Sequence, residues 1–240
     1  MASWIIHLRI AENLLGWNPN LNAEKFALGS VAPDSGKPDE NWEVFTPSTE
    51  ITHFDTAENY PRRIADLDFY RRYLAPLRGT ADTGLISFRT GYFFHLITDS
   101  LWSKEIGMPT HQRFEAEFTA DKAFIWEVKK DWYGLDFIYL RDHTDCLFWS
   151  VFRTALPDRG GLDFLIPESL AWSVNHIQQY YQRTDTEVQA LYNRPYIYLS
   201  AAQADGFVEA STRQISRIYK QLWIDGMPAD GLVSALDLKF

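Results

Sequence analysis

The segment from Gly91 to Trp102 places two polar side chains, His95 and Asp99, within a strongly apolar stretch. Its apolar residues recur at spacings of three and four, which predicts a helix buried on most of its circumference. Residues four apart point the same way on a helix. Because buried unpaired polar groups cost roughly 1–3 kcal/mol each, we expect either a structural hydrogen-bonded pair or two ligands of one metal ion.

The composition limits the classes of protein to which the chain can belong. Its 240 residues are 46% hydrophobic and 15% aromatic, enough to bury a sizeable core. A formal net charge of −9 argues against a nucleic-acid binder that follows phosphates. The single cysteine, Cys146, excludes an intrachain disulfide framework and a cysteine-rich zinc site.

Neither a membrane-spanning segment nor a signal peptide is expected. No run reaches the roughly 18 apolar residues that a transmembrane helix needs. The first ten residues have too short an apolar run, which is interrupted by His7 and Arg9. We therefore predict a cytoplasmic location and no integral membrane segment.

Apolar spacing, caps and prolines predict an all-α fold in one domain, residues 1–240, with about seven to nine helices. No convincing strand pattern or internal repeat is present. Helices are expected from Ser3 to Gly16, from Ala23 to Leu28, from Pro61 towards Gly79, from Thr80 or Asp82 through Asp99, from Thr110 towards Leu135, and over 144–156, 167–183 and 199–225.

Three further candidate ligands precede the central helix. His7 lies on the first expected helix, Asp34 in a loop between Pro33 and Gly36, and His53 in a long proline-containing connection. Each also has an ordinary structural interpretation: a satisfied helical histidine, an Asx-turn or cap, and a loop hydrogen-bonder. Three imidazoles and two carboxylates are ligand types that suit zinc and its neighbours, and five exceed what one ion with an open position needs.

Other polar residues are weaker candidates. His111 and Glu115 repeat the four-residue spacing, but at what looks like a solvated first turn. Asp131 and the isolated His143 are left open as additional ligands, and so is Asp136 as a pocket residue. His176 has no acidic residue three or four positions away and is interpreted as structural. Trp126, Trp132 and Tyr133 line a pocket or belong to the core.

The ordered set of motifs resembles the zinc-dependent phospholipase C family. The set comprises a helix with Trp4 and His7, then Phe26-Ala-Leu-Gly-Ser-Val-Ala-Pro-Asp34, Thr-His53-Phe, and Phe-His95-Leu-Ile-Thr-Asp99. Together these motifs cover about the first hundred residues. That family has an all-helical fold with a trinuclear zinc cluster and hydrolyses phosphodiester bonds of phospholipids.

The resemblance implies a metal-dependent phosphoric ester hydrolase. It implies that Asp99 bridges two ions, that Asp34 is a candidate general base, and that a metal-bound water attacks phosphorus. The metal ligands that it implies are His7, Asp34, His53, His95 and Asp99.

The chain also departs from the family pattern. Secreted members use the amino group of an N-terminal tryptophan as a ligand, whereas Trp4 follows three residues here. Their downstream His, His and Glu ligands have no clear match in the spacing of His111, Glu115 and His143. We therefore expect one or two ions, zinc or another divalent metal, and a small-molecule phosphoester or lipid head-group as substrate.

Two alternatives remain at this point. One is a helical metal-dependent nucleotide phosphohydrolase. The other is a non-catalytic α-helical binding or scaffold domain, in which His95 and Asp99 form a buried structural pair.

Overall fold

The computed structural model describes residues 1–56 and 64–239, and these confirm the all-α prediction. The protein is 66% helix and 3% strand. The α-helices are α1 Trp4–Trp17, α2 Ala23–Gly29, α3 Thr49–Thr52, α4 Asp66–Phe69, α5 Thr83–Trp102, α6 Met108–Arg113, α7 Glu115–Ala120, α8 Phe124–Asp142, α9 Leu147–Ser150, α10 Pro167–Tyr180, α11 Thr186–Asn193 and α12 Ala201–Tyr219.

Shorter elements join these helices. β1 (Lys37–Pro38) and β2 (Phe45–Thr46) form a small antiparallel pair in the proline-containing connection. The remaining elements are 3-10 or π turns: η1 Ala32–Asp34, η2 Tyr70–Leu74, η3 Ala75–Leu77, η4 Ser103–Gly107, η5 Phe152–Thr154, η6 Lys220–Ile224 and η7 Ala235–Asp237.

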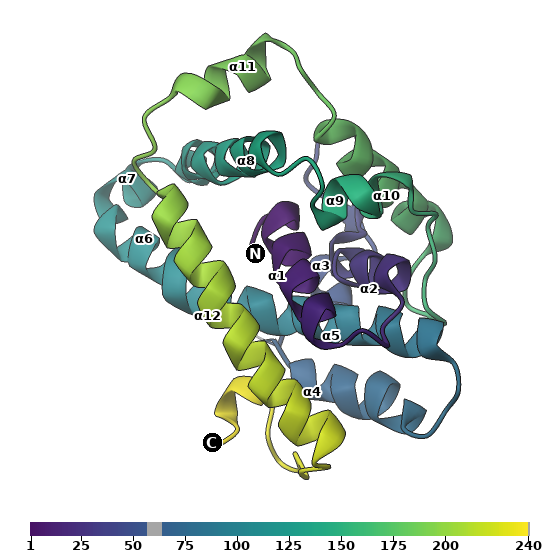
Figure 1. Cartoon of the computed structure of the whole chain (residues 1–240). Coiled ribbons are helices and arrows are strands. Elements are labelled where there is room, and N and C mark those ends of the chain that lie inside the picture. The colour runs from purple at the N-terminus through teal and green to yellow at the C-terminus, as the bar shows by residue number, and fades with distance from the viewer. Residues whose placement is uncertain (57–63, 240) are drawn as a thin grey trace.

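Helix α5 runs through the interior of the molecule, with α1 and α2 on one side of it and α4 on the other (Figure 1). It begins where the Asp82 carboxylate accepts a hydrogen bond from the Leu85 backbone amide, as the sequence suggested. From Thr90 to Asp99 every side chain is buried. This burial explains why the helix is apolar on almost all sides.

Two glycines let α2 and α5 approach backbone to backbone. A Cβ at Gly91 would overlap the carbonyl oxygen of Phe26, and a Cβ at Gly29 would overlap that of Phe88. Neither position tolerates a side chain, because interiors are packed without spare volume. The close approach places Ser30 and the following turn, η1, directly against α5.

Buried carboxylates outside the predicted cluster tie distant segments together. Asp136 on α8 accepts hydrogen bonds from Ser3 Oγ (2.7 Å) and Tyr181 Oη (2.5 Å). Asp66 accepts from Ser234 Oγ and the Ala235 amide, both at 2.7 Å. Burial raises the pKa of both Asp66 and Asp136 to about 7. These two residues have structural roles.

Several predicted helix boundaries were wrong. The helix expected from Thr110 towards Leu135 is three helices, since the backbone leaves the helical region at Phe114 (φ −118°, ψ 34°) and Asp121 (φ −141°, ψ 111°). The segment 144–156 holds only α9 and η5, and α11 was not predicted. The start of the helix expected from Pro61 lies outside the described residues.

One continuous hydrophobic core joins α1, α2, α5, α8, α10 and α12. In the part of the chain that the structure describes, no helix combines the length and apolarity needed to cross a membrane.

Replacing Gly91 with alanine is expected to lower the free energy of unfolding by about 1–3 kcal/mol, because the new methyl group overlaps the α2 backbone. The matched control is Gly206→Ala on α12, where a Cβ meets nothing within 4 Å. That variant should gain roughly 0.5–1 kcal/mol from helix propensity. Urea denaturation measures both, and equal effects at the two glycines would contradict the packing.

The raised pKa of Asp66 predicts a pH-dependent stability. The folded protein holds the proton up to about pH 7, whereas the unfolded chain releases it near 3.8. The contribution of the protonated carboxyl is thus complete below the lower value and is lost as pH rises through the upper one. The Asp66→Asn amide offers one acceptor and one donor, as the protonated carboxyl does, but cannot titrate.

The free energy of unfolding of the wild type, minus that of Asp66→Asn, should therefore fall between about pH 4 and pH 7. The slope should approach ~1.4 kcal/mol per pH unit. Urea denaturation at several pH values tests this. Identical pH profiles for the two proteins would show that Asp66 is ionised in the fold.

Candidate metal site

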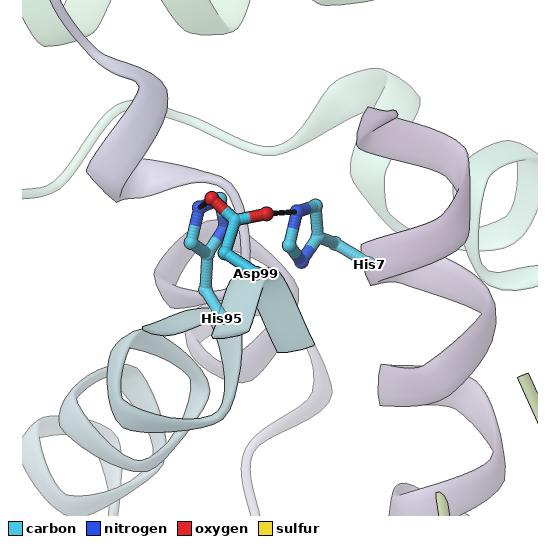
Figure 2. A group of neighbouring side chains, drawn as sticks. All are labelled: His7, His95 and Asp99. Atoms are coloured by element: carbon cyan, nitrogen blue, oxygen red, sulfur yellow. Dashed lines mark ion pairs between the residues drawn. The ribbon is translucent and has the colours of Figure 1, made fainter. Parts of the chain in front are cut away.

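The fold brings all five predicted ligand side chains together. His7 comes from α1, Asp34 from the end of η1, His53 from the residue after α3, and His95 and Asp99 from adjacent turns of α5. Figure 2 shows His7 reaching across from α1 to Asp99, with His95 beside the same carboxylate. Four of the five are buried, and the Asp34 side chain is 10% exposed.

Three ligand atoms form a triangle at the centre of the cluster. His53 Nε2 lies 3.2 Å from His95 Nε2 and 3.4 Å from Asp99 Oδ2, and the third edge, from His95 Nε2 to Asp99 Oδ2, is 3.6 Å. Ligand atoms around a tetrahedral zinc, with bonds of about 2.0–2.1 Å, lie roughly 3.3–3.4 Å apart. The triangle therefore has the dimensions of one face of such a site.

The other two side chains lie beside the triangle. Asp34 Oδ1 lies 3.4 Å from His53 Nε2, and His7 Nε2 lies 3.3 Å from Asp99 Oδ1. The two oxygens of Asp99 thus face different histidines. Oδ2 faces the triangle, whereas Oδ1 lies beside His7 and also accepts a hydrogen bond from the Ala2 backbone amide at 2.8 Å.

Backbone and hydroxyl groups orient the two central imidazoles. His95 Nδ1 lies 2.9 Å from the Ser30 carbonyl oxygen, which only accepts hydrogen bonds, so Nδ1 carries the proton and Nε2 keeps its lone pair. His53 Nδ1 lies 3.1 Å from Thr52 Oγ1. Both Nε2 atoms therefore point inward. With a single free nitrogen, His95 can serve only one ion.

Several polar atoms in the cluster lack hydrogen-bond partners. His7 Nδ1, His7 Nε2 and Asp99 Oδ2 are buried, and each is unsatisfied. The 3.6 Å separation of His95 and Asp99 is also too long for a hydrogen bond between them. A structural pair leaves these atoms unexplained, whereas a cation would satisfy lone pairs on the inward-facing nitrogens and oxygens.

The electrostatics of the cluster favour a cation. Burial raises the pKa of the Asp34 and Asp99 carboxyls. At Asp34 the contacts with His53 and His95 outweigh burial, and at Asp99 the positive charge of the amino terminus and the contacts with imidazoles outweigh it, so both pKa values fall below the ordinary range. Burial and the neighbouring His95 lower the pKa of His7 to about 4, so His7 is neutral at pH 7. A neutral imidazole is the form that binds metal.

His53 is the exception among these groups. Burial lowers its pKa, but contacts with Asp34 and Asp99 outweigh this effect and the net direction is upward. Without a metal, a proton on His53 partly compensates the two buried carboxylates. A divalent cation would take the place of that proton and neutralise the remaining charge.

Of the residues left open, none joins the five-residue cluster in the described part of the chain. Asp131 accepts hydrogen bonds from the Tyr198 and Leu199 amides. His143 is exposed, with Nδ1 2.9 Å from the Tyr139 carbonyl oxygen. His176 stacks on Trp172 at a centroid distance of 4.8 Å. These three have ordinary structural roles.

Two cavities reach the cluster. A cavity of about 440 Å³ is lined by Asp99 and by apolar side chains that include Trp102 and Val128. A second, of about 210 Å³, is lined by Asp34, His53 and several aromatic rings. The sequence left open whether three aromatic residues line a pocket or belong to the core. All three line these cavities: Trp126, Trp132 and Tyr133.

Sequence reasoning missed the orienting groups. Ser30 acts on His95 through its backbone carbonyl, which has no side-chain signature. Thr52 precedes His53 within a recognised motif, but the role of its hydroxyl depends on the local backbone.

Comparison with known proteins identifies no relative. No family model matches the chain, and neither the curated proteins nor the solved structures contain a match. The resemblance to the zinc-dependent phospholipase C family stays a prediction, and the geometry described above has to support any function by itself.

Protein purified without chelators should contain one to two equivalents of zinc or a similar ion by elemental analysis. Zinc at 100 times its dissociation constant should raise the free energy of unfolding by about 2.7 kcal/mol. Combining His53→Ala with Asp99→Asn should abolish both effects, because it removes two corners of the triangle.

His143→Ala is the matched control, since this histidine is exposed and outside the cluster. It should retain the metal. Wild-type protein that takes up no zinc, or a double variant that binds as much zinc as the wild type, would rule the site out.

Proposed function

We propose that this protein is a metal-dependent phosphoric ester hydrolase with a zinc-type centre of one or two ions. The observation that carries the proposal is the triangle of His53 Nε2, His95 Nε2 and Asp99 Oδ2, which has ligand spacing. It lies where two cavities meet buried carboxylates. A substrate that enters either cavity would therefore reach the groups that bind the cation.

The residues divide into holding and reacting roles. His53, His95 and Asp99 hold the central ion, and His7 contributes at the Oδ1 side of Asp99. Asp34 is the most exposed of the five and lines the smaller cavity. Its carboxylate is ionised, since its pKa lies below the ordinary value, and it can take a proton from a water molecule in that cavity.

A bound divalent ion would supply Lewis acidity, lowering the pKa of a coordinated water and neutralising charge on phosphoryl oxygens. The chain's own groups supply the rest. The proton held on Nδ1 of His95 by Ser30 keeps Nε2 available, and apolar walls such as Trp102 limit water around the cluster. Asp34 accepts the proton that nucleophilic attack releases.

The cavities suit a small-molecule phosphoester or a lipid head-group. The larger cavity, about 440 Å³, has the volume of a small-ligand site, and the adjoining one, about 210 Å³, would take only part of a ligand. Aromatic side chains at the smaller cavity, among them Trp42 and Trp126, also favour a planar substituent, which supports nucleotide hydrolysis as a second candidate. The scaffold alternative gains no support, because it leaves the buried His7 Nε2 and Asp99 Oδ2 without partners.

Asp34→Asn is expected to lower kcat towards a chromogenic phosphodiester such as bis(p-nitrophenyl) phosphate by about 10²–10⁴-fold, because the amide cannot accept the proton. At least one zinc equivalent should remain, since the triangle is intact. Asp230→Asn, at an exposed carboxylate, is the matched control and should keep full activity. Unchanged kcat in a zinc-loaded Asp34→Asn protein would remove Asp34 from the reaction.

A further inference from the structure

Lys129 of helix α8 lies where the two cavities meet. It lines both of them, in the company of Asp99 in the larger cavity and of Asp34 and His53 in the smaller one. Among the described residues, it is the only lysine or arginine that lines either cavity. Lys129 therefore presents a cationic side chain to both cavities.

The ammonium group of Lys129 has no carboxylate partner within the described part of the chain. Its Nζ instead lies 4.6 Å from the ring centroid of Trp126, a residue that is 60% exposed. The adjacent Lys130 makes an ordinary ion pair with Glu127. Since cations partly withdrawn from water are usually paired, the arrangement of Lys129 calls for a ligand.

The charges around Lys129 agree with this interpretation. Burial lowers its pKa, and the negative charges of Asp34 and Asp99 act in the opposite direction. The carboxylates are thus near enough to sense the ammonium, although they form no ion pair with it. An anion placed between Lys129 and a cation in the cluster would be attracted from both sides.

We propose that Lys129 is an anion-binding residue, whose ammonium holds an oxygen of a phosphate or phosphoester group over the His–Asp cluster at the junction of the two cavities. The assignment of that anion as a reacting phosphoester rests on the proposed function. The binding of the anion itself does not, because it is measured with inorganic phosphate.

This location predicts how Lys129 acts on binding. An ammonium group offers three donors and a full positive charge, and the cation–π contact with Trp126 restrains its position. An oxygen held by Lys129 is bound before the reaction as well as during it. Loss of the charge should therefore raise KM more than it lowers kcat.

The test is calorimetric titration of inorganic phosphate into zinc-loaded and metal-free protein. Lys129→Gln should weaken phosphate binding at least tenfold, whereas Lys129→Arg, which keeps the charge, should bind within a few-fold of the wild type. Lys130→Gln is the matched control, because it removes the neighbouring exposed charge and should leave the affinity unchanged. Zinc content and the thermal unfolding midpoint confirm that each variant is folded.

Two outcomes overturn the inference: wild-type protein that binds no phosphate in either state, or Lys129→Gln that binds as tightly as the wild type. Failure of the proposed function looks different. If no zinc binds but metal-free protein takes up phosphate in a Lys129-dependent manner, the anion site stands and the metal hydrolase does not. If zinc binds, phosphoesters are hydrolysed and Lys129→Gln leaves phosphate affinity unchanged, the hydrolase stands and the role of Lys129 is wrong.

Discussion

The contact between the backbones of α2 and α5 is the constraint on which the rest of the site depends. Gly29 and Gly91 leave no room for side chains, so the end of α2 lies directly on α5. That position delivers the Ser30 carbonyl to Nδ1 of His95 and starts the turn that carries Asp34. This close helix crossing therefore fixes the tautomer and the ring orientation of His95, and it positions the carboxylate of Asp34.

The cluster beside this crossing concentrates ionisable groups. Two ionised carboxylates, Asp34 and Asp99, share a buried region with imidazoles of which His7 is neutral. Buried carboxylates elsewhere in the fold behave differently, because Asp66 and Asp136 each accept two hydrogen bonds and have raised pKa values. Asp66 and Asp136 are thus arranged to hold a proton, whereas Asp34 and Asp99 are arranged to hold a cation.

The sequence predicted the helical class, the start of α2 at Ala23 and, as one of two candidates, the start of α5 at Asp82, because capping side chains act locally. It also identified the five side chains that the fold brings together, because the order of the motifs and the types of ligand residue can be read from the sequence alone. The sequence did not predict helix boundaries that depend on tertiary contacts, such as the breaks that separate α6, α7 and α8. Lys129 was missed because a lone lysine in a helix carries no signal until its cavity is known.

Anomalous diffraction at the zinc absorption edge, from crystals grown with zinc, tests the central claim most directly. The account predicts a peak within about 2.0–2.2 Å of His53 Nε2, His95 Nε2 and Asp99 Oδ2. Absence of a peak there, with the two Nε2 atoms joined by a hydrogen bond across their 3.2 Å separation, would contradict it. The cluster would then be a buried polar network.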